Sequence, residues 1–146
     1  MNWKFEAIEK LKEYTARKNA ITSIPEEIAR LEEEARRIRS ATTDATPVKG
    51  GGSTREDMLL SNIVHREELK RRLSDALRWV DIVDGGLAVL SDEDRLVLDR
   101  FYIHQMRGNV ERLRDELGLE DERSVYKRKD KALRRFTVAL YGICEQ

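Results

Sequence analysis

The sequence predicts an all-α protein in which a long N-terminal helical hairpin, or coiled coil, precedes a C-terminal helix-turn-helix. Apolar residues recur at spacings of three and four along several long stretches, and glycine and proline stand mostly between those stretches. Charged residues make up 38% of the chain, above the roughly 25% of average globular proteins, which suits long helices with solvated faces. The predicted segments are helices at 1–40, a linker at 41–53, a long helix at 54–86 and the helix-turn-helix at 87–142.

The segment 1–40 is expected to be helical, because apolar side chains fall near helical spacing over residues 3–21. Ser23 and Glu26 then form the pattern of a capping box around Pro25, which predicts that a helix restarts or kinks there. Beyond Pro25 runs a heptad seam with charged flanks, made by Ile24, Ile28, Leu31, Ala35 and Ile38. This seam is a candidate for coiled-coil pairing and for a homodimer through the N-terminal helices.

Residues 41–53, ATTDATPVKGGGS, have no apolar periodicity and are rich in threonine and glycine, which predicts a loop or linker. A phosphate-binding loop is not indicated, because Lys49 precedes the glycines and no G-K-[ST] follows them.

The segment 54–86 predicts a single helix about 45 Å long, at 1.5 Å per residue. Its expected apolar stripe is Leu59, Ile63, Leu69, Leu73, Ala76, Leu77, Val80 and Val83. The linker lets this helix fold back on the first segment, so that each covers the apolar stripe of the other. Gly85 and Gly86 are expected to end or bend it.

The segment 87–142 predicts a series of shorter helices. Ser91 is expected to cap a helix that continues to Gly108, and Asn109 to cap a second one that ends at Gly118. Asp121 caps the last helix, which runs to about Tyr141. Two helices joined by a glycine-containing turn are typical of a helix-turn-helix.

The last helix has an apolar face and a basic face. Its expected buried stripe is Val125, Ala132, Leu133, Phe136, Ala139 and Leu140. The N-terminal half of a recognition helix meets base edges, which makes Arg123, Tyr126 and Lys127 candidates for sequence readout. The cationic side chains further along, Lys131, Arg134 and Arg135, are candidates for phosphate contacts.

Charge is segregated in the last third of a chain whose formal net charge is zero. Residues 91–122 hold ten acidic and five basic side chains, whereas residues 123–146 hold seven basic and two acidic ones. A basic helix is often only a solvated face. A second alternative is a helical protein-interaction or assembly module whose basic helix docks on an acidic protein surface.

The stretches LSDEDRLVLDRFY, LRDELGL and SVYKRKDKALRRF, between Leu87 and Leu140, resemble region four of bacterial sigma factors. The whole chain is similar to phage and prophage regulators of the ArpU and RinA type, most specifically in KALRRFTVALYG. The resemblance implies a DNA-binding regulator of phage late genes, an activator that acts with host RNA polymerase. The chain departs from complete sigma factors, because residues 1–53 do not resemble their promoter-melting region.

The resemblance also implies roles for single residues. It makes Val125 the buried anchor of the recognition helix and turns Glu122, Arg123, Tyr126 and Lys127 towards the groove. Glu122 is expected either to accept a hydrogen bond from a cytosine amino group or to cap the helix. Arg128 departs from the family pattern, which has an apolar residue there. Either its aliphatic stem covers the core while its guanidinium reaches a phosphate, or the register of the resemblance shifts locally. The complete expected DNA-binding set is Glu122, Arg123, Ser124, Tyr126, Lys127, Arg128, Lys131, Arg134 and Arg135.

No pattern in the sequence predicts an enzyme, a metal site or a cofactor. His65 and His104 lack metal-ligand spacing and Cys144 has no partner base or second thiol, whereas Trp3 and Trp79 are expected to anchor a core or an interface. The chain shows no apolar run of membrane-spanning length and no apolar leader. A cytoplasmic protein of the bacterial host cell, with double-stranded DNA as partner and no membrane, is expected.

Overall fold

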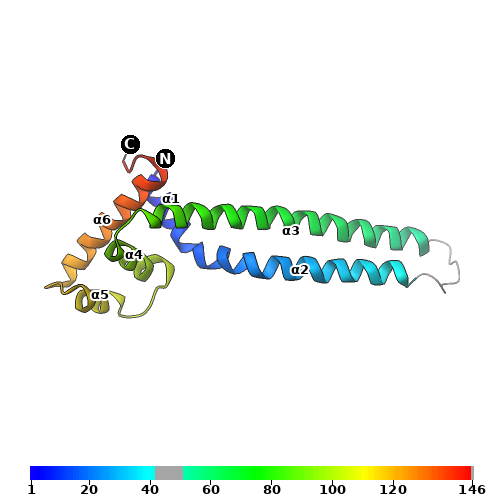
Figure 1. Cartoon of the computed structure of the whole chain (residues 1–146), viewed down its shortest axis with the longest axis horizontal. Coiled ribbons are helices and arrows are strands. Elements are labelled where there is room, and N and C mark those ends of the chain that lie inside the picture. The colour runs from blue at the N-terminus through cyan, green and yellow to red at the C-terminus, as the bar shows by residue number, and fades with distance from the viewer. Residues whose placement is uncertain (42–50, 146) are drawn as a thin grey trace. The chain divides into compact units, whose positions relative to one another are not determined.

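A computed structural model describes residues 1–41 and 51–145, and the elements assigned in these ranges are all helical. In chain order they are α1 (Trp3–Lys12), α2 (Tyr14–Ser40), α3 (Gly51–Ala88), α4 (Asp92–Leu98), the π-helical turn η1 (Asp99–Ile103), α5 (Asn109–Leu117) and α6 (Glu122–Tyr141), as drawn in Figure 1. The all-α class is therefore confirmed. Residues 42–50 of the predicted linker, with Lys49, lie outside the described residues.

The N-terminal helices divide at a position different from the predicted one. The break falls at Glu13, between α1 and α2, whereas Pro25 lies inside α2. Of the two predicted alternatives at Pro25, a restart or a kink, the restart capped by Ser23 is therefore wrong. A proline within a helix lacks the N–H that would bond four residues back, but the flanking turns keep their own hydrogen bonds and packing. Asn2, which the sequence reading did not single out, caps α1 by accepting a hydrogen bond from Phe5 N at 3.0 Å.

Helix α3 is longer at both ends than predicted. It begins at Gly51, within the predicted linker, and continues through Gly85 and Gly86 to Ala88. The expectation that the two glycines end the helix is therefore wrong, because both keep helical backbone geometry. Gly86 is buried, and a Cβ added to it would lie 2.8 Å from Phe136 Cε1 and 2.8 Å from Leu140 Cδ2. The missing side chain at this position is what lets α3 and α6 approach closely.

The described chain divides into two compact units, one of Met1–Arg17 with Arg78–Gln146 and one of Lys18–Leu77. In the Lys18–Leu77 unit, Ile28 and Leu31 of α2 pack against Leu69 of α3, as the heptad seam predicts. Asn62 is also buried there, donating to Leu31 O at 2.9 Å and accepting from Arg66 Nε at 2.8 Å. The prediction that Ile63 and Leu77 belong to the buried stripe is wrong, because both are exposed. The buried face is rotated so that Asn62 takes the inward position.

In the other unit, α6 is the central helix and packs against α1, α4 and α5. The buried side chains come from six segments and meet around Phe136: Ala7, Leu11, Val83, Leu90, Val97, Leu98, Leu113, Val125, Ala132, Leu133 and Phe136. Trp79 packs on this core as expected, and its Nε1 donates to Lys10 O at 3.0 Å while Lys10 and Arg17 cover its ring. Trp3 stacks on Tyr141, with ring centroids 4.9 Å apart.

Two of the predicted limits of the short helices are wrong. The helix capped by Ser91 ends at Ile103 and not at Gly108, because α4 passes into the π-helical turn and closes at His104. The residue at the N-cap of α5 is Gly108, in a left-handed conformation, and not Asn109. The Asn109 side chain instead donates to Arg100 O at 2.9 Å, which ties the start of α5 to η1.

Tyr14 gives the fold a pH dependence at the alkaline end. Burial and a 2.6 Å hydrogen bond to Asp84 raise the pKa of Tyr14 to about 12. Because the pKa in the folded state is above the usual 10, the stabilisation is complete below pH 10 and is lost as pH rises towards 12. We expect Tyr14→Phe to flatten the fall in the free energy of unfolding across this range, measured by urea denaturation at successive pH values. An unchanged slope would contradict the assignment.

Candidate nucleic-acid interface

The turn between α5 and α6 is fixed by local chemistry that the sequence predicted. Gly118 ends α5 in the left-handed region, with φ of 66°, and Leu119 N donates to Arg114 O at 2.9 Å. Asp121 then caps α6, accepting from Ser124 N at 2.9 Å and from Ser124 Oγ at 2.7 Å. These two hydrogen bonds from Ser124 lower the pKa of Asp121, with smaller contributions from Arg123 and Lys127. Ser124 is therefore engaged in the cap.

The apolar face of α6 is mostly as predicted. Val125, Ala132, Leu133 and Phe136 are buried, and Leu140 is partly buried. Ala139 is exposed, so its predicted burial is wrong. Thr137 is also fully buried. Its hydroxyl donates a hydrogen bond to Leu133 O at 2.7 Å, so the buried polar group has a partner within the helix. The burial of Val125 sets the direction in which its neighbours Arg123 and Lys127 point.

The opposite face of α6 carries a row of free cations. Arg123, Lys127 and Lys131 are exposed, and within the described residues no acidic side chain lies in ion-pair contact with any of them. Their spacing of four residues places them on one side of the helix. Together, Arg123, Lys127 and Lys131 are called the cationic row below. Glu122 is exposed beside its first member.

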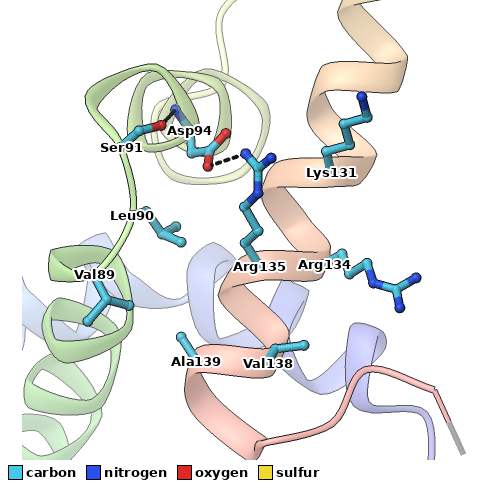
Figure 2. A pocket seen from close by; sticks show the side chains of 9 residues that line it. All are labelled: Val89, Leu90, Ser91, Asp94, Lys131, Arg134, Arg135, Val138 and Ala139. Atoms are coloured by element: carbon cyan, nitrogen blue, oxygen red, sulfur yellow. Dashed lines mark hydrogen bonds and ion pairs between the residues drawn. The ribbon is translucent and has the colours of Figure 1, made fainter.

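The three remaining arginines of the predicted set pair with acidic side chains of the chain itself. Arg128 pairs with Glu93 and Arg135 with Asp94, at 2.8 Å in the second case, and both acids lie in the first turn of α4 (Figure 2 for the second pair). Asp94 is only 2% exposed, so its pairing is part of the fold. Arg134 lies 3.5 Å from Glu145. Glu93 and Asp94, in the acidic segment before α6, thus neutralise Arg128 and Arg135 of α6 directly.

Tyr126 and Lys129 form an aromatic and cationic cluster at the start of α6. Tyr126 is 46% exposed, and its ring meets Phe101 edge-on with centroids 5.9 Å apart. Lys129 Nζ lies 5.4 Å from the Phe101 centroid and 5.5 Å from the Tyr126 centroid. The sequence reading assigned no role to Lys129. Its helical position, three residues after Tyr126, is the signal that places the two side chains together.

The candidate reactive groups are two histidines and one cysteine. His65 is exposed in the Lys18–Leu77 unit, and His104 at the end of η1 has its Nδ1 2.7 Å from Asp99 Oδ1. Cys144 is buried. Among residues 1–41 and 51–145, no group of three histidine, cysteine or acidic side chains is placed to hold a metal ion. No helix in these ranges is long and apolar enough to cross a membrane.

Comparisons of the chain with models of known families, with curated proteins and with solved structures found no match.

Proposed function

We propose that the chain is a sequence-specific duplex-DNA-binding protein in which α5 and α6 act as a helix-turn-helix. The observation that carries the proposal is the cationic row, which is exposed and unpaired on the side of α6 away from the core. From Arg123 to Lys131 the row extends about 12 Å along the helix, at 1.5 Å per residue. A B-DNA major groove about 12 Å wide admits one helix, and phosphates flank it on both sides.

The position along α6 divides the proposed roles. Arg123, Tyr126 and Lys127 stand in the first turns, where a recognition helix meets base edges, and Glu122 beside them is an acceptor for a cytosine amino group. Lys131 stands further from the N-terminus, where phosphate oxygens are the expected partners. Arg128 and Arg135 contribute less to duplex affinity in this proposal, because they are held by Glu93 and Asp94.

We extend the proposal to transcription on the strength of the sequence resemblance. The chain acts, on this proposal, as a cytoplasmic regulator of phage late genes that activates together with host RNA polymerase. The α2 and α3 segments of the Lys18–Leu77 unit form a hairpin that supplies the homodimer contact. Exposed apolar side chains on α3, Leu60 and Val64, support an interaction role for that hairpin.

Two single substitutions test the division of roles. We expect Lys131→Ala to weaken binding to all duplex sequences alike and to reduce the slope of log affinity against log salt by about 1, because one phosphate contact is lost. We expect Lys127→Ala to reduce discrimination between a selected site and a mixed-sequence duplex, by about 1–3 kcal/mol. Fluorescence anisotropy across a salt series measures both. Equal effects of the two substitutions on specific and mixed duplex would contradict this division.

A protein-interaction module without DNA binding is the second candidate, and the exposed apolar side chains Leu60 and Val64 favour it. Arg128, Arg134 and Arg135 already have acidic partners within the chain, so part of the basic charge serves internal contacts. This candidate predicts little affinity for any duplex at physiological salt. The anisotropy measurement on the wild-type chain separates the two.

A further inference from the structure

An open cleft of about 770 Å³ lies where the end of α3 and the start of α4 meet the C-terminal half of α6. Its apolar lining comes from Val89 and Leu90 on one side and from Val138 and Ala139 on the other (Figure 2). Two of the lining side chains stay in contact with solvent, since Val89 is 72% exposed and Val138 is 43% exposed. A volume of this size lies within the usual range of ligand-binding clefts, about 300–1,000 Å³.

The unpaired charge at the cleft is positive. Lys131 and Arg134 lie at its edge on α6; the described residues give Lys131 no ion pair, and Arg134 lies 3.5 Å from Glu145 in an exposed pair that an acidic partner can replace. Asp94 lines the cleft too, but Arg135 neutralises it at 2.8 Å. The cleft is thus an apolar floor with a cationic border. The apolar floor of the cleft, with its exposed valines, does not suit binding to phosphates. This distinguishes the cleft from the cationic row at the N-terminal half of α6.

We propose that this cleft binds an amphipathic helix of a partner protein, with apolar side chains on the floor and acidic side chains against Lys131 and Arg134. The charge complementarity carries the choice of partner, and an amphipathic helix presents the apolar and acidic side chains that the floor and the border of the cleft require. The inference does not depend on duplex binding, because the floor lies outside the row formed by Arg123, Lys127 and Lys131. Lys131 is the one residue that the two surfaces share. Binding of the partner helix at Lys131 therefore lowers the affinity for duplex, and binding of duplex lowers the affinity for the partner.

The test is a selection of random peptides displayed on phage against the full chain, with counter-selection against Val89→Ser/Val138→Ser. We expect peptides with leucine or phenylalanine at helical spacing beside glutamate or aspartate. Their affinity falls by about tenfold or more in the serine variant, since burial of valine side chains is lost. Arg134→Ala weakens them less and reduces the salt dependence. Both valines are exposed, so circular dichroism will check that the serine variant keeps its helices.

Duplex binding provides the matched control. Arg123→Ala/Lys127→Ala should keep peptide affinity, and Val89→Ser/Val138→Ser should keep duplex affinity. Selected peptides that are not acidic, or that bind the serine variant as well as the wild type, would overturn the proposal. A wild-type dimer that the serine variant dissociates in light scattering would assign the cleft to a second copy of the chain and overturn it too. So would a loss of duplex binding in the serine variant.

Discussion

Gly86→Ala is expected to lower the free energy of unfolding by about 1–3 kcal/mol, as overpacking of a filled core does. The added Cβ would stand 2.8 Å from Phe136 Cε1 and 2.8 Å from Leu140 Cδ2. Leu140 can turn its side-chain end away, but Phe136 is fully buried, so its ring can move only by displacing other core side chains. The clash outweighs the roughly 1 kcal/mol that a helix gains when alanine replaces glycine.

Gly85 provides the matched control, because it is the adjacent residue in α3 and a Cβ there meets nothing within 4 Å. We expect Gly85→Ala to raise the free energy of unfolding by up to about 1 kcal/mol. Urea denaturation followed by circular dichroism gives both values. If the two variants shift stability in the same direction and by the same amount, the close approach of α3 and α6 at Gly86 is wrong.

Arg135→Ala is expected to destabilise the fold by about 2 kcal/mol while changing duplex affinity less than Lys131→Ala does. The substitution leaves the Asp94 carboxylate buried without its 2.8 Å partner, and a buried unpaired charge is costly. More than half of the Arg135 side chain remains in contact with water, which keeps the cost below that of a fully buried pair.

Lys131→Ala is the comparison on the same helix, because that side chain is exposed and has no ion pair among the described residues. Its effect on stability should stay within about 0.5 kcal/mol, as for ordinary surface positions. Thermal unfolding and duplex anisotropy on both variants give the four values. A large loss of duplex affinity in Arg135→Ala with unchanged stability would instead place Arg135 among the direct DNA contacts.

Local chemistry made much of the fold predictable from sequence. The cap of α6 by Asp121, the cap of α4 by Ser91 and the end of α5 at Gly118 each depend on residues within one turn, and all three are present. The buried positions of α2 follow from the apolar repeat alone. The apolar stripe of the last helix predicts that Val125 points inward, and this residue is fully buried.

Features that depend on distant partners were not predictable in the same way. The pairing of Arg135 with Asp94 joins residues 41 apart, and nothing near either residue indicates the other. Gly85 and Gly86 resemble a helix end in sequence, but Phe136 packs against the second of them and the helix continues. Asn62 occupies an inward position because Leu31 O accepts its hydrogen bond.

Duplex affinity of the triple variant Arg123→Ala/Lys127→Ala/Lys131→Ala tests the central claim most directly. The control is Lys12→Ala/Arg71→Ala/Arg78→Ala, which removes three exposed cations elsewhere and changes the net charge equally. At moderate salt we expect the first variant to lose about a hundredfold in affinity for a mixed-sequence duplex, at roughly 1 kcal/mol per contact, and the control to change little. Equal losses in the two variants, or a wild-type chain that binds no duplex, would contradict the assignment of α6 as a DNA-reading helix.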